Sequence, residues 1–159
     1  MVCGKQVFAC HQFMLAARSP VLRAMLESPM KEEAATRRVE ITDLSPEVVE
    51  AMLLFMYSGS VPNLAEAAGD LLAAAEKYQL DQLKELCQQQ LINTTDVGNA
   101  VGHLFLGDRY QAPGLRKRAM GFVVPNMREV LANPEKKRKL IDQPALLAEV
   151  TMEFMAGSE

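Results

Sequence analysis

The side chains of this 159-residue chain that are best suited to chemistry are its three cysteines and two histidines. Cys3, Cys10 and His11 lie close together in the sequence, but their spacing matches no zinc-binding pattern. Cys87 falls in an amphipathic segment, where a small buried hydrophobe is expected rather than a nucleophile. His103 lies among apolar residues and is expected to be hydrogen-bonded or partly exposed on a helix. The sequence therefore predicts no metal site, no cofactor and no catalytic centre.

Two other patterns allow more than one interpretation. The basic run at residues 136–139 is compatible with a nuclear-localisation patch or a site for an acidic partner, although a solvated helix face is more common. Gly98 and Gly102 are four residues apart, a spacing that permits close contact between helices or merely weakens one helix. The sequence contains no glycine-rich phosphate-binding loop and no hydrolase-like order of serine, histidine and aspartate. An enzyme is therefore not predicted.

The composition of the chain limits its class. Its length fits one domain, or one domain with a small appendage. The formal charge of −3 argues against nucleic acid as the main partner. No long apolar run and no signal peptide are visible, so we predict neither a membrane span nor secretion. Three cysteines cannot all pair, which favours a reduced, intracellular protein of the nucleus or cytoplasm.

Residues 11–32 are the segment around which the chain is organised, with two short helices expected on either side of Ser19-Pro20. The first helix, residues 11–18, contains five consecutive apolar residues, more than one buried stripe of a helix can hold. One of its faces can pack on its own domain, and the other needs a second body. The simplest candidate is a second copy of the chain. The expected homodimer interface consists of Phe13, Met14, Ala17 and Val21.

The rest of the chain predicts a small sheet and many helices. A β-hairpin is expected near the start, with its turn at residues 3–6, and a short strand at residues 38–41. Ser45 followed by Pro46 marks a helix start, and Gly59 marks the end of that helix. Further helices are expected at residues 64–78, 81–91, 97–110, 113–125, 128–142 (broken near 133–134) and 144–155. A domain boundary is placed after residue 93.

Several short motifs occur in the order in which they stand in a BTB/POZ domain, and the chain resembles that family over about two thirds of its length. The motifs are Phe8-Ala9-Cys10-His11, Leu15-Ala16-Ala17-Arg18-Ser19-Pro20-Val21, Ala24-Met25, Val39-Glu40-Ile41, Phe55-Met56-Tyr57-Ser58-Gly59 and the segment at residues 70–78. The residues of these motifs are most similar to those of the speckle-type POZ proteins of the MATH-BTB group.

The resemblance implies an α+β fold in two parts. Residues 1–93 would form a BTB/POZ domain, mostly helical with a small sheet, whose first strand we expect to be truncated. Residues 94–159 would form a helical extension that resembles the 3-box and BACK helices of cullin adaptors. In MATH-BTB proteins a separate upstream domain binds the substrates, and we expect this domain to be missing here.

One short motif, Met30-Lys31-Glu32, gains its meaning from the resemblance. An apolar residue, any residue and then glutamate is the cullin-contact signature of BTB adaptors, and here it lies between an expected helix and an expected strand. The alternative is that Met30 packs on its own domain and Glu32 is a solvated charge.

The resemblance therefore implies a non-catalytic homodimer that binds the cullin-3 N-terminal domain and recruits substrates to a cullin-3 RING ubiquitin ligase. The alternative is a BTB dimerisation module of a transcriptional regulator, whose dimer groove binds a corepressor.

Overall fold

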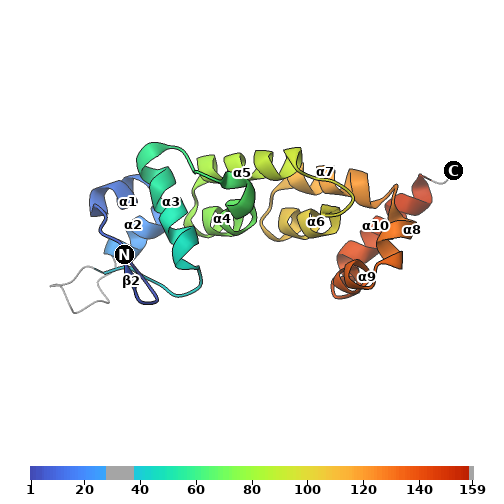
Figure 1. The fold of residues 1–159 in the computed structure, drawn as a ribbon, viewed down its shortest axis with the longest axis horizontal. Coiled ribbons are helices and arrows are strands. Elements are labelled where there is room, and N and C mark those ends of the chain that lie inside the picture. The colour runs from blue at the N-terminus through green and yellow to red at the C-terminus, as the bar shows by residue number, and fades with distance from the viewer. Residues whose placement is uncertain (28–37, 158–159) are drawn as a thin grey trace. The chain divides into compact units, whose positions relative to one another are not determined.

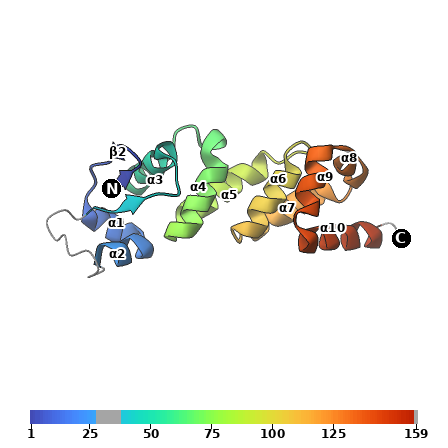
Figure 2. The ribbon, with the colours of Figure 1, turned by 90° about the horizontal axis from the view of Figure 1, so that it is seen from below.

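A computed structural model of the chain describes residues 1–27 and 38–157, and these residues form three short strands and ten helices. The chain divides into two compact units, Met1–Cys87 and Gln88–Glu159. Figures 1 and 2 show the elements of each unit in two views. The α+β class and the helical extension predicted from the sequence are confirmed.

The small sheet belongs to the first unit, and its strand order is β2-β1-β3 (Figure 2). β1 (Val2–Cys3) pairs antiparallel with β2 (Gln6–Val7), and it pairs in parallel with β3 (Glu40–Ile41). The hairpin turn needs a left-handed residue, which Gly4 supplies at φ 57° without steric cost. Cys3 is part of the ladder rather than of the turn, so the turn is shorter than the sequence predicted.

α1 (Gln12–Arg18) and α2 (Pro20–Glu27) lie next to each other in the first unit (Figure 1). Ser19, which separates them, is fully buried, and its backbone N–H donates to the carbonyl of Leu15. Its side chain accepts a hydrogen bond from the backbone N–H of Leu22, at 3.1 Å, as an N-cap does. Pro20 starts α2 because its fixed φ suits a first helical residue and its missing N–H is not needed there.

The core of the first unit is built around α3 (Pro46–Ser58) and α4 (Leu64–Tyr78). α3 begins as predicted, because the hydroxyl of Ser45 accepts from the backbone N–H of Val48. It ends as predicted at Gly59, which has φ 74°. Six side chains of α3 are buried, as expected for a helix that is apolar on most sides: Val48, Val49, Met52, Leu53, Phe55 and Met56. α5 (Asp81–Asn93) follows and runs across the division between the two units.

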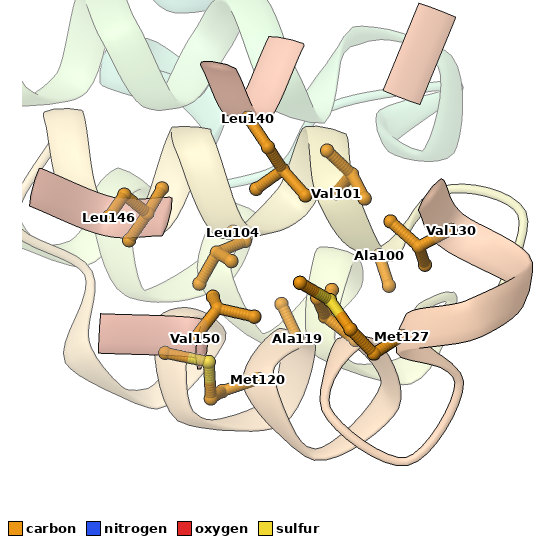
Figure 3. Close-up of a cluster of buried hydrophobic side chains, with 11 residues drawn as sticks. Ala100, Val101, Leu104, Ala119, Met120, Met127, Val130, Leu140, Leu146 and Val150 are labelled. Carbon is orange, nitrogen blue, oxygen red and sulfur yellow. The ribbon is translucent and has the colours of Figure 1, made fainter. Parts of the chain in front are cut away.

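The second unit is entirely helical in its described part. Its helices are α6 (Ala100–Arg109), α7 (Pro113–Val123), α8 (Met127–Ala132), α9 (Pro134–Ile141) and α10 (Pro144–Ala156). Their bounds agree closely with the sequence prediction, including the break at Asn133-Pro134. Side chains from all five helices form one buried cluster (Figure 3): Ala100, Val101, Leu104, Ala119, Met120, Val123, Met127, Val130, Leu140, Leu146 and Val150.

α6 and α7 approach each other closely at Gly107. A Cβ added there would lie 2.6 Å from the backbone nitrogen of Arg116, so only glycine fits this contact. An added Cβ at Gly102 would meet nothing within 4 Å, and one at Gly98 would meet only the side chain of Asp96. The sequence suggested close helix contact or a weakened helix for the pair at 98 and 102. The close contact lies instead at Gly107, which no sequence pattern singled out.

Candidate functional site

The most exposed large apolar side chain of the described residues is Phe13 on α1, which is 79% exposed. Ala17, one helical turn further on, is also exposed, and Met14 is half-buried. Leu15 points the other way and is buried in the core of the first unit. α1 therefore buries one face within its own unit and leaves an apolar face open, which is the division expected from its five consecutive apolar residues.

Three hydrogen bonds hold α1 and α2 in position. At the start of α1, the backbone N–H of His11 donates to the hydroxyl oxygen of Tyr57, 2.7 Å away. At the junction of the helices, the Ser19 hydroxyl donates to the carbonyl of Tyr78 at 2.6 Å. The Nε of Arg23 donates to the carbonyl of Ala16 at 2.9 Å, near the end of α1. The exposed apolar face is therefore carried by an anchored helix pair.

Two hollows adjoin this face within the first unit. One, of about 510 Å³, is mostly apolar and is lined by Pro20, Val21, Ala24, Met25 and Gln79. The other, of about 340 Å³, shares Pro20 and Gln79 with it and has two arginines among its lining residues, Arg18 and Arg23. Val21, expected in a dimer interface, is half-buried and lines the first hollow. We call the surface formed by Phe13, Met14, Ala17 and Val21 the α1–α2 face.

The predicted cullin contact, Met30-Lys31-Glu32, lies at residues 28–37, outside the described residues. It follows α2 and precedes β3 in the chain. The role of this segment in binding cullin-3 stays a prediction.

The cysteines and histidines occupy structural positions. Cys87 is fully buried, and burial raises the pKa of its thiol to about 12, so the reactive thiolate is disfavoured. Cys3 is buried too, and its thiol donates to the carbonyl of Leu44 at 3.1 Å. His103 is half-buried, with its Nδ1 2.9 Å from the hydroxyl oxygen of Thr95. Among residues 1–27 and 38–157, no cluster of three or more metal-ligating side chains occurs.

Burial lowers the pKa of His103, because desolvation disfavours the imidazolium, and the charge of Asp96 opposes this shift. The hydroxyl of Thr95 has a single hydrogen, and it donates this hydrogen to the carbonyl of Leu91 at 2.7 Å. The contact with His103 is therefore best satisfied when Nδ1 carries the proton and donates to Thr95. His103 is thus a hydrogen-bonded residue on a helix, as predicted from the sequence.

Sequence reasoning missed two residues that position the α1–α2 face. Ser19 was interpreted only as part of a helix break, although a serine before a proline at a helix start is a recognisable N-cap signal. Its second hydrogen bond joins it to Tyr78, 59 positions away, and no local pattern indicates that. Tyr57 was interpreted as the end of a helix, and its hydroxyl contact with His11 likewise depends on the fold.

Comparison with known protein families shows which family the first part of the chain resembles. The family model of the BTB/POZ domain matches residues 1–95, which include the whole first unit. None of the described helices is both long enough and apolar enough to cross a membrane.

Proposed function

The chain belongs to the BTB/POZ domain family, whose model covers 95 of its 159 residues, and from this premise we propose that it is a dimeric adaptor for a cullin-3 ubiquitin ligase. BTB/POZ domains are protein-interaction modules, generally without enzymatic activity, and they commonly dimerise and bind partners. In the proposed role, the first unit pairs with a second copy and binds the cullin-3 N-terminal domain. Substrates would be bound by a domain outside this chain.

The observation that carries the dimer is the exposure of the α1–α2 face. Burying a phenylalanine side chain contributes about 1.5–3 kcal/mol, and Phe13 leaves most of its surface available for such burial. A two-fold axis would bring the same face of both copies together, so that every contact occurs twice. The hollow lined by Pro20, Val21, Ala24, Met25 and Gln79 offers a mostly apolar recess into which a partner side chain can insert.

The cullin contact is proposed from the sequence motif and its place in the family-matched part of the chain. Met30 would be the buried anchor, since the flexible thioether of methionine adapts to an irregular pocket. Glu32 would orient the contact at its polar rim, and Lys31 lies between them. A few buried anchors usually carry most of the binding energy of an interface, whereas rim charges act mainly on specificity and association rate.

Light scattering behind a sizing column tests the dimer. The wild-type chain should show twice the monomer mass at micromolar concentration, and Phe13→Asp or Met14→Asp should shift it toward the monomer. Val7→Asp is the matched control, because Val7 is 72% exposed but lies on β2 rather than on α1 or α2. A monomeric wild type would contradict the dimer, and dissociation by the control as well would contradict the α1–α2 face as its interface.

Calorimetric titration with the cullin-3 N-terminal domain tests the adaptor role. Met30→Glu or Met30→Ala should weaken binding by about 2 kcal/mol or more, as expected for an interface hot spot. Glu32→Ala should weaken it less, and the neighbouring Glu33→Ala is the matched control with little effect. If the wild type does not bind cullin-3 at all, the corepressor-binding alternative becomes the better account.

A further inference from the structure

Every polar group of Ser19 takes part in a hydrogen bond, and these bonds join three helices of the first unit. The backbone N–H donates to the carbonyl of Leu15 on α1 at 3.0 Å, and the backbone carbonyl accepts from the N–H of Arg23 on α2 at 2.9 Å. The hydroxyl oxygen accepts from the N–H of Leu22 at 3.1 Å, and its single hydrogen goes to the carbonyl of Tyr78 on α4 at 2.6 Å. Ser19 is therefore the residue at which α1, α2 and α4 are connected.

The hydroxyl of Ser19 completes the ends of two helices at once. It caps the start of α2, and it bonds to the carbonyl of the last residue of α4, where a helix offers no partner of its own. The chain turns away from α4 at the next residue, Gln79, which has a left-handed φ of 52°. Ser19 and Tyr78 are both buried, so no water replaces the hydroxyl at this carbonyl unless the helices move apart.

The bond between Ser19 and Tyr78 also ties together the two walls of the mostly apolar hollow of about 510 Å³. One wall is Gln79, the residue after Tyr78. The other wall is α2, which begins directly after Ser19 and contributes Pro20, Val21, Ala24 and Met25. The bond therefore joins the two walls one residue before each of them, and the width of the hollow depends on it.

We propose that Ser19 is a positioning residue for the association of two copies of the chain. Because it is fully buried, it cannot contact a partner itself. Its hydroxyl instead holds α2 against the end of α4 and sets the width of the hollow that receives a side chain of the second copy. Without the hydroxyl, α2 is free to shift relative to Gln79, and Val21 of the α1–α2 face shifts with it. This inference rests on the proposed dimer and adds a residue outside its contact surface that controls its affinity.

The dissociation constant of the dimer, measured on the full chain by analytical ultracentrifugation, tests the proposal. Ser19→Ala should weaken the dimer about threefold to tenfold, the size of effect that one buried hydrogen bond has. Ser19→Cys, whose thiol is a weaker donor and acceptor, should give a smaller loss, and it takes the place of Ser19→Ala if that variant does not fold. Circular dichroism establishes that each variant is folded under the conditions of the measurement.

Ser45→Ala is the matched control. Like Ser19, Ser45 precedes a proline at a helix start and accepts from the N–H three residues on, here that of Val48 at 3.4 Å. This cap lies within one end of α3 and does not hold α2 against α4. Ser45→Ala should therefore lower Tm but leave the dissociation constant of the dimer unchanged.

A double-mutant cycle with Val21→Ala separates positioning from a general loss of stability. If Ser19 acts by placing the wall of the hollow that contains Val21, Ser19→Ala should weaken the dimer less in the Val21→Ala background than in the wild type. Additive losses, an equal loss in Ser45→Ala, or a Ser19→Ala dimer as tight as the wild type would each overturn the inference and leave the proposed dimer standing. A wild type that is monomeric at every concentration would instead overturn the dimer and this inference together.

Discussion

Replacing Gly107 by alanine tests the packing of α6 on α7, which organises the second unit. The added Cβ would lie 2.6 Å from the nitrogen, 2.8 Å from the Cα and 2.9 Å from the Cβ of Arg116. These contacts are mostly with backbone, which cannot rotate away as a flexible side chain can. The helices must therefore separate locally, and Leu104 and Ala119, which belong to the same buried cluster, would lose contact.

The magnitude follows from two opposing effects. Overpacking a core typically costs about 1–3 kcal/mol, and contacts this short place Gly107→Ala at the upper end. Alanine returns about 0.8–1 kcal/mol through its higher helix propensity. The net loss is about 2 kcal/mol. In a chain of this size, each kcal/mol of lost stability lowers Tm by roughly 2–4 °C. The expected fall in Tm is therefore roughly 4–8 °C.

Thermal unfolding followed by circular dichroism measures this change, with Gly102→Ala and Gly121→Ala as controls. Both controls lie inside helices with no atom near the added Cβ, so they gain helix propensity alone and should raise Tm by a few degrees. If Gly107→Ala is as stable as the wild type, α6 and α7 do not approach at this residue. If the Tm of the controls falls equally, backbone conformation rather than the contact with Arg116 explains the loss of stability.

Three further predictions concern local features. Gly59→Val should lower the stability by about 1–2 kcal/mol, because the φ of 74° at this position disfavours a β-branched residue, and Gly59→Asn should lower it less. Equal melting temperatures of Gly59→Val and the wild type would contradict the assigned helix end. Labelling the thiols of the folded protein near neutral pH should modify half-buried Cys10 quickly and leave buried Cys87, with a pKa of about 12, unreactive. Fast labelling that persists in the Cys10→Ser variant would refute this. The lowered pKa of His103 means that the unfolded chain binds more protons than the folded chain as the pH falls through 6.5, so the stability should fall there. Chemical denaturation should show that the stability of His103→Gln depends less on pH. An unchanged pH dependence would exclude His103 as its source.

Much of the fold could be predicted from the sequence because its signals are local. The start of α3 depends on a hydrogen bond between Ser45 and Val48, three residues apart, and its end depends on the backbone freedom of Gly59 itself. The helices of the second unit are similarly bounded by prolines, as at Pro113, Pro134 and Pro144. Such signals act within one helical turn, so they are present in the sequence whatever the rest of the chain does.

The candidate surfaces were predicted in part. The run of apolar residues at 13–17 indicated a helix with more apolar surface than its own unit can cover, and the exposure of Phe13 agrees with that. The roles of the α1–α2 face and of Met30-Lys31-Glu32 in binding stay predictions.

The sequence by itself determined where helices begin and end, which side of each helix is apolar and which family the first unit belongs to. Only the tertiary structure decided which helices meet and where. It places the Ser19 hydroxyl on the carbonyl of Tyr78, packs α7 closely against Gly107 rather than Gly102, and brings Lys136 to the carbonyl of Val97. The physical reason is that periodicity sets the face a helix buries, whereas the partner of that face depends on how all the helices share one core.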